Sequence, residues 1–237
     1  IFLAEQTLGD PFALKLLKTL FLVKYVKGFK ATPRNLRVLM QESFDQNIQA
    51  LESRVRQALA LLEQQTYVQR NDDVYEYLTE EEQDVENEIK NTPVENDEIY
   101  KVLEDIFFTE ILRDSKIRYE DNQQDYPFAK RIDGKQRGKD HEMVIDIITP
   151  YNQFSNDINS LRGHSAGYAH LLVVLPEDAQ FMQDVLMTIR TDSYIRQHHA
   201  LNNSETRNAI LASKGSQNSL RKKNVAKQAA ELVSKAR

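Results

Sequence analysis

The chain has 237 residues, enough to bury the core of one large domain or two smaller ones, and its 41% hydrophobic and 28% charged residues are ordinary for a globular protein. It contains no cysteine, which excludes disulfides and thiolate metal sites, and its net charge of −5 argues against indiscriminate binding to nucleic acid. No apolar run approaches the roughly 20 residues that cross a bilayer, so we expect no membrane contact and a cytoplasmic location.

Capping residues predict the first two helices. Asp10 is a suitable N-cap and Pro11 suits the first helical position, so a helix should begin there and end at Gly28. This segment is apolar on most sides, which predicts a helix buried at the centre of its domain. Thr32 and Pro33 repeat the start signal and predict a second helix.

A third helix and a hairpin follow. Apolar residues recur at helical spacing over 46–64, whereas 66–70 and 74–78 are rich in β-branched and aromatic residues and flank the turn residues 71–73. Three helices followed by a hairpin is the order of a winged-helix domain. In that interpretation helix 46–64 is the recognition helix and the hairpin is the wing.

A helix and a domain boundary are predicted after the hairpin. Thr79 and Glu82 have the spacing of a capping box, so a helix should begin there and reach about Lys90. The polar run 91–97 is typical of a boundary, and 97–112 is predicted to be helical again.

The second half of the chain mixes strands with helices. Strands are predicted at 116–119, 127–132, 143–149 and 171–175. The last two lie in near-continuous apolar runs, which predicts central strands buried on both faces. From Glu177 the pattern returns to helix, with a last basic helix from about Asn218. The segment from Arg207 has a sparse apolar stripe, which predicts an exposed arm.

Together these elements predict an α+β protein of three parts. A helical winged-helix domain covers 1–92, an α/β domain with a small mixed sheet covers 93–176, and a helical extension covers 177–237. The charge is uneven, because 71–98 holds twelve acidic residues and one basic residue, whereas 207–237 holds eight basic residues and one acidic residue. We expect two differently charged surfaces, with ordinary solvated helix faces as the alternative.

The sequence predicts no catalytic or cofactor site. A P-loop needs glycine-rich backbone ahead of a Lys and a Ser or Thr, and neither 161–170 nor 213–219 has that order. The acids Asp133, Glu142 and Asp146 lack the nearby lysine of a metal-dependent nuclease, and no Ser-His-Asp grouping is visible. We therefore expect no enzyme activity from this chain.

The histidines do not predict a metal site. His198 and His199 are adjacent, so on a helix their side chains would point about 100° apart, which is poor geometry for metal ligands. A polar surface role is the expectation for both.

Nucleic-acid contact is the one remaining candidate site. Arginines on the second and third helices and on the wing could meet phosphates: Arg34, Arg37, Arg54, Arg56 and Arg70. The wing tip Asn71-Asp72-Asp73 is acidic and would repel a DNA backbone. A winged helix that packs on protein is at least as well supported by the charges.

Three runs carry a resemblance to a known family. They are LLKTLFLVKYVKGFKATPRNLRVLM, SRVRQALALLEQQTYVQRNDDVYEYLTEEEQDVENEIKNT and KIRYEDNQQDYPFAKRIDG. The chain resembles BrxC, the large P-loop ATPase of the BREX phage-defence system, which is related to PglY of the phage-growth-limitation system. The resemblance covers most of 12–176, and the long, idiosyncratic run over 62–82 makes it specific.

The resemblance implies a piece of a larger ATPase, which also fits a first residue, Ile1, that is not Met. ATP and Mg²⁺ would bind an N-terminal module that this chain lacks, and no residue here matches the ATP site. The implied role is defence against phage beside a DNA-modifying methyltransferase, with other BREX subunits as partners and oligomerisation of the full-length protein left open.

Three functions are thus weighed. The first is a non-catalytic regulatory or interaction fragment that contacts duplex DNA or other BREX subunits. The second is a stand-alone winged-helix transcriptional regulator, which would need a basic recognition face. The third is a nuclease built on the 117–175 sheet, which would need converging acids and a lysine.

Overall fold

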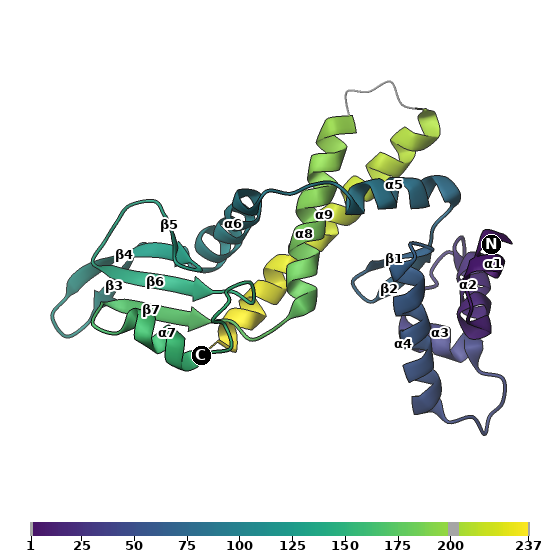
Figure 1. The fold of residues 1–237 in the computed structure, drawn as a ribbon, viewed down its shortest axis with the longest axis horizontal. Coiled ribbons are helices and arrows are strands. Elements are labelled where there is room, and N and C mark those ends of the chain that lie inside the picture. Colours follow the sequence, from purple (N-terminus) through teal and green to yellow (C-terminus); the bar gives the residue numbers. More distant parts are fainter. Residues whose placement is uncertain (1, 199–203, 237) are drawn as a thin grey trace. The chain divides into compact units, whose positions relative to one another are not determined.

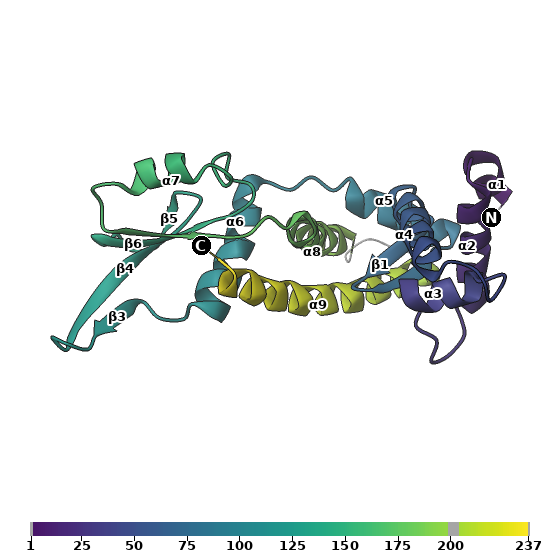
Figure 2. The ribbon, with the colours of Figure 1, turned by 90° about the horizontal axis from the view of Figure 1, so that it is seen from below.

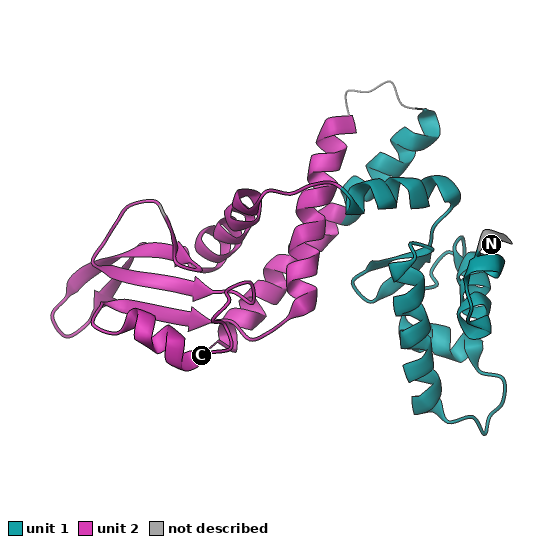
Figure 3. Cartoon of the chain, viewed as in Figure 1, with its two compact units in different colours: residues 1–91, 200–217 teal, residues 92–199, 218–237 magenta. Residues whose placement is uncertain are grey.

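A computed structural model describes residues 2–198 and 204–236, and the chain divides into two compact units (Figure 3). Unit 1 comprises residues 1–91 and 200–217, and unit 2 comprises 92–199 and 218–237. The stretch 177–237, expected as a separate extension, is therefore shared between the units.

Unit 1 consists of helices and one β-hairpin (Figure 1). Its elements are α1 (Phe2–Thr7), α2 (Pro11–Val23), α3 (Pro33–Met40), α4 (Ile48–Gln64), β1 (Val68–Asn71), β2 (Val74–Tyr77), α5 (Glu80–Lys90) and the first part of α9 (Glu205–Ser234). The predicted order of three helices and a hairpin is present, preceded by the unpredicted α1.

Side-chain caps begin these helices as the sequence indicates. The carboxylate of Asp10 accepts from the Phe12 amide at 2.8 Å, and the Thr32 hydroxyl accepts from the Asn35 amide at 3.2 Å. At α5 both halves of the predicted capping box are formed between Thr79 and Glu82. Each cap satisfies backbone donors that the first helical turn leaves without a partner.

Helix α2 departs from the prediction of a centrally buried helix. Its buried face is Ala13, Leu16, Leu17 and Leu20, which pack in one core with residues of α3, α4 and the hairpin. The other face is open, since Leu22 is 74% exposed, and the helix ends at Val23 rather than near Gly28. The apolar run is long because it holds both a core face and an exposed apolar surface.

The hairpin of unit 1 has a two-residue turn. Asn71 pairs with Val74 in the antiparallel register, and Asp72 in the turn adopts a left-handed φ of 60°. Asp and Asn tolerate this conformation better than most residues, which explains the choice of turn residues. The amide of Tyr75 donates to the carbonyl of Ala31 at 3.0 Å and ties the hairpin to the segment before α3.

Unit 2 is built on a mixed sheet (Figure 1). Its elements are α6 (Asn96–Glu104), a π-helix η1 (Asp105–Ile111), β3 (Lys116–Tyr119), β4 (Gln124–Ile132), β5 (Lys135–Arg137), β6 (Met143–Ile148), α7 (Ile158–Ser165), β7 (His170–Val174), α8 (Ala179–His198) and the last part of α9. The predicted small mixed sheet is confirmed.

The strand order is β3-β4-β6-β7, with β5 also paired to β4. Strands β4, β6 and β7 run parallel, whereas β3 and β5 are antiparallel to β4. The prediction that the apolar run of β7 forms a central strand is wrong, because β7 lies at the edge of the sheet and Leu171 is 54% exposed. An apolar run alone does not distinguish an edge strand from a central one.

The two faces of this sheet have different partners. Ile132 and Ile147 point into a core formed with η1, α8 and α9. Residues one position away, among them Arg131 and Asp146, line a cavity that α7 also borders. Figure 2 shows α7 over one face of the sheet. The period of two along each strand thus separates an apolar core from a polar site.

Helix α6 changes character where the sequence predicts a continuous helix over 97–112. From Asp105 onward the backbone is a π-helix of seven residues, and its Ile106, Phe107 and Phe108 are buried. The ammonium of Lys130 donates to the carbonyls of Phe108 at 3.2 Å and Leu112 at 3.4 Å. This lysine therefore satisfies carbonyl groups at the end of the widened turn.

Helix α9 also differs from the prediction. It runs from Glu205 to Ser234 without a break, whereas the sequence predicted a separate last helix from about Asn218. The segment from Arg207 is not an exposed arm, since Ile210 and Leu211 are buried and Val225 lies in the core of unit 2. Its stripe looked sparse because polar residues, Lys214 and Asn218, occupy buried positions between the apolar ones.

Candidate functional site

The five candidate arginines of unit 1 are largely engaged. Glu52 accepts from Arg37 and from Arg56, each at 2.9 Å. Arg70 lies 3.6 Å from a carboxylate oxygen of Glu63.

The two other arginines lie on exposed helix positions. The guanidinium of Arg54 stacks over the Phe12 ring at 4.4 Å from its centroid, and Arg34 is exposed on α3. Three of the five candidates therefore have a carboxylate beside them, which reduces the positive charge that they could offer to phosphate.

The acidic and basic segments pair with each other inside unit 1. Lys214 of α9 forms an ion pair with Glu86 of α5, and both residues are more than 90% buried. The Lys214 ammonium also donates to the side-chain oxygen of Gln69 at 2.5 Å. Nearby, Arg207 pairs with Glu88 at 2.5 Å. The predicted pair of separate charged surfaces is thus partly replaced by a contact between them.

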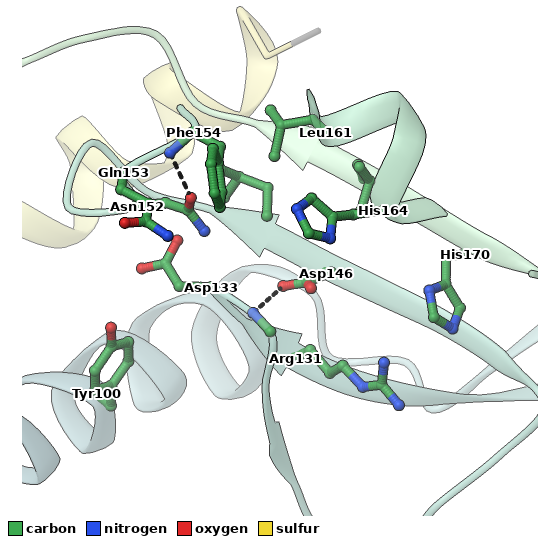
Figure 4. Close-up of a pocket in the computed structure, with 13 residues that line it drawn as sticks. Tyr100, Arg131, Asp133, Asp146, Asn152, Gln153, Phe154, Leu161, His164 and His170 are labelled. Atoms are coloured by element: carbon green, nitrogen blue, oxygen red, sulfur yellow. Dashed lines mark hydrogen bonds between the residues drawn. The ribbon is translucent and has the colours of Figure 1, made fainter. Parts of the chain in front are cut away.

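A polar pocket of about 430 Å³ lies in unit 2, between the sheet and α7. Figure 4 shows Arg131, Asp146 and His170 on neighbouring strands, with His164 and Leu161 contributed by α7. Arg131 and Asp146 are direct partners in the parallel register of β4 and β6, so their side chains stand on the same face. The pocket therefore brings both charges together on a partly apolar surface.

Asp133 anchors one end of the pocket. It occupies a two-residue turn between β4 and β5 with Gly134, and both residues have positive φ, 51° and 78°. Its carboxylate accepts from the Thr149 amide at 2.7 Å and from the Thr149 hydroxyl at 2.6 Å. Burial raises the pKa of Asp133 while these hydrogen bonds lower it. Its oxygens thus hold the loop after β6.

Asp146 is bonded less completely. It is 7% exposed, and one of its oxygens accepts from the Gly134 amide at 3.2 Å. Burial raises its pKa above the ordinary value, the hydrogen bond from Gly134 opposes this, and the negative charge of Asp133 adds to the rise. Beside it, Nε of Arg131 is buried and has no hydrogen-bond partner in the part of the chain that the structure describes.

The described residues contain no group of three or more His, Asp or Glu side chains placed to hold a metal ion. His198 instead bonds the carbonyl of Tyr194 at 2.9 Å and stacks on its ring. His199 lies outside the described residues.

Sequence reasoning considered Asp133 and Asp146 only as nuclease acids and missed Arg131, His164 and His170. One available signal was the Asp133-Gly134 dipeptide, which is typical of a type I′ hairpin turn. It would have placed β5 and Asp133 correctly. The pairing of β4 with β6, and so the meeting of Arg131 with Asp146, has no local signal.

The fold and pocket define a two-unit α+β protein whose sheet packs on η1, α8 and α9 with one face and forms a polar pocket with α7 on the other. The family model described as "BREX ATP-binding protein BrxC 4th domain with six-stranded beta sheet" matches residues 92–237, and the chain belongs to this family. The match begins at the first residue of unit 2. No solved structure matches the chain.

This membership confirms the resemblance and places the chain in BREX phage defence, with other BREX subunits as partners. It gives no support to a stand-alone transcriptional regulator. The family description names six strands, whereas the sheet of unit 2 has five among the described residues. No described helix combines the length and apolar character that a membrane span requires.

Proposed function

We propose that this chain is a non-catalytic interaction module of a cytoplasmic BrxC-type protein, in which unit 1 acts as a winged-helix domain that packs on another BREX subunit. The pairing of Arg37 and Arg56 with Glu52, and of Arg70 with Glu63, supports a protein partner rather than DNA. ATP and Mg²⁺ would then be held by another part of the full-length protein.

The end of α2 and the residues directly after it offer a surface for such a partner. Phe21, Leu22, Tyr25 and Val26 are 44%, 74%, 77% and 52% exposed and follow one another closely in sequence. Exposed apolar side chains gathered in a short segment commonly mark a protein contact, because leaving them in water is unfavourable. We call these four residues the α2 surface.

The test uses this 237-residue chain co-expressed with the other BREX subunits. The variant Leu22→Asp/Tyr25→Asp should reduce the amount of a BREX subunit that co-purifies with the chain by about 10-fold or more. The reason is that charged side chains replace the two most exposed residues of the α2 surface. Phe44→Asp is the matched control, since Phe44 is fully exposed outside the α2 surface. Equal recovery with both variants would contradict the proposal.

Duplex DNA is the second candidate partner, because Arg34, Arg54 and Arg56 are exposed. We expect little DNA binding by this chain, and no strong salt dependence, in a titration between about 50 and 200 mM salt. An affinity that falls steeply with salt and disappears in Arg54→Glu/Arg56→Glu would establish the DNA-reading alternative instead.

A further inference from the structure

The pocket of unit 2 contains polar groups whose hydrogen bonding is incomplete. Asp146 is more than 90% buried, yet its carboxylate accepts one described hydrogen bond, from Gly134. A buried carboxylate can accept several. Arg131, on the neighbouring strand, donates through one terminal nitrogen to the side-chain oxygen of Gln136 at 3.1 Å, whereas its buried Nε has no hydrogen-bond partner among the described residues. The pocket therefore offers a carboxylate with spare acceptor capacity beside a buried donor, and a ligand or a water could satisfy both.

The walls of the pocket suit a flat ligand. Its volume of about 430 Å³ lies in the range of small-molecule sites. Ile148 and Leu172 line it from the sheet, whereas the rings of Phe154 and His164 lie 5.2 Å apart on the α7 side. An apolar floor and ring-bearing walls favour an aromatic ring over a sugar or a chain.

The two charged side chains, Asp146 and Arg131, determine which hydrogen-bonding groups the aromatic ligand must carry along one edge. Asp146 accepts hydrogen bonds and Arg131 donates them, so the ligand needs donors beside acceptors along one edge. Guanine has this pattern, with N1–H and the N2 amino group next to O6 and N7. Adenine offers one amino donor and no oxygen acceptor, which leaves part of the edge unmatched.

We propose that this pocket binds a guanine base, with Asp146 accepting from N1–H and the N2 amino group and Arg131 donating to O6 and N7. The base can be carried by a free nucleotide or by a single-stranded nucleic acid. Asp133 positions the pocket rather than reading the base, because both its oxygens are bonded to Thr149. The proposal concerns unit 2 alone and does not rest on the role of unit 1.

Calorimetric titration of the 237-residue chain with guanosine and with adenosine tests the proposal. Guanosine should bind at least about 10-fold more tightly than adenosine, and Asp146→Asn should weaken guanosine binding by about 10- to 100-fold, because charge-assisted hydrogen bonds are lost. Asp125→Asn on the same sheet is the matched control, since Asp125 lies outside the pocket in an exposed pair with Lys116. A thermal melt verifies that each variant is folded.

Two further ligands test whether the guanine base belongs to a free nucleotide or to a single-stranded nucleic acid. Guanosine monophosphate represents a free nucleotide, and a dT oligomer with a single dG represents a strand; tighter binding of either one identifies the source and supports the proposal. Absence of guanosine binding at millimolar concentration overturns it. So does equal affinity for adenosine, or equal affinity in the Asp146→Asn and Asp125→Asn variants.

Discussion

At the scale of single residues, the buried charges are the most consequential feature. Lys214 and Glu86 are each more than 90% buried and compensate one another, and Gln69 supplies a further acceptor. A buried charge that loses its partner keeps the cost of desolvation without the attraction that offset it. Unit 1 therefore depends on a residue far along the chain.

Lys214→Met should lower the free energy of unfolding by about 3–5 kcal/mol, because it leaves Glu86 charged and buried. Urea denaturation measures this loss. Lys222→Met is the control, since the pair of Lys222 with Asp192 is largely exposed and should contribute less than about 1 kcal/mol. Adding Glu86→Leu to Lys214→Met should recover much of the loss, and failure to do so would argue against the buried charge as its cause.

Asp146 leads to a prediction about pH. Burial raises its folded-state pKa, so the folded protein retains a proton that the unfolded chain releases, and stability falls as the pH rises from the ordinary carboxyl pKa of about 4 through the folded-state pKa. Asp146→Asn should therefore stabilise the protein by about 0.5–2 kcal/mol at pH 7 and much less near pH 4. Denaturation at both pH values measures this. The variant leaves the other ionisable residues of the pocket in place, namely Arg131, Asp133, His164 and His170. An equal gain at both pH values would exclude charge burial.

At the scale of elements, the π-helix η1 depends on a strand residue. Lys130 of β4 donates to two carbonyls at its end, and its ammonium lies 5.4 Å from the centroid of the Phe108 ring. Widened helical turns are uncommon, and the last carbonyl groups of any helix have no partner within it, so Lys130 supplies donors for two of them. The contact fixes η1, and with it Phe107, against the sheet.

Lys130→Met should cost about 1–2 kcal/mol of unfolding free energy, because it removes both hydrogen bonds while keeping most of the apolar stem. Hydrogen exchange should show faster opening of η1 than in the parent protein. Lys139→Met, at an exposed position, should leave both measurements nearly unchanged. Uniform loss of protection across unit 2 would contradict a local role.

At the scale of the whole molecule, each unit is assembled from separate segments. The core of unit 2 combines Phe107 and Ile147 with Phe181 and Val185 of α8 and Leu232 of α9. Residues 93–176, predicted from sequence as a domain, omit the last three of these. A chain ending at 176 would expose the helix face of its sheet to water.

We therefore expect a fragment of residues 92–237 to unfold cooperatively in urea, with helix and strand signals in circular dichroism. A fragment of 93–176 should show neither a cooperative transition nor dispersed amide signals. If the shorter fragment also folds, then α8 and α9 are dispensable for the sheet.

The sequence predicted what is encoded locally. The caps at Asp10 and Thr79 and the hairpin turn at Asp72 each depend on a few neighbouring residues, and all are present. It did not predict pairings between distant segments, such as Lys214 with Glu86 or Arg131 with Asp146. Charge runs and apolar runs indicate that a partner is needed, but tertiary packing decides which one.

The pairing of Glu86 with Lys214 also has a consequence for synthesis, because it joins residues 128 positions apart. On a ribosome, α5 is complete long before Lys214 has been translated, and domains generally fold as their residues emerge. Until that moment Glu86 of α5 lacks its partner Lys214. A nascent chain paused within unit 2 should therefore be cut by proteases near α5, and the same region should become protected only once α9 is released.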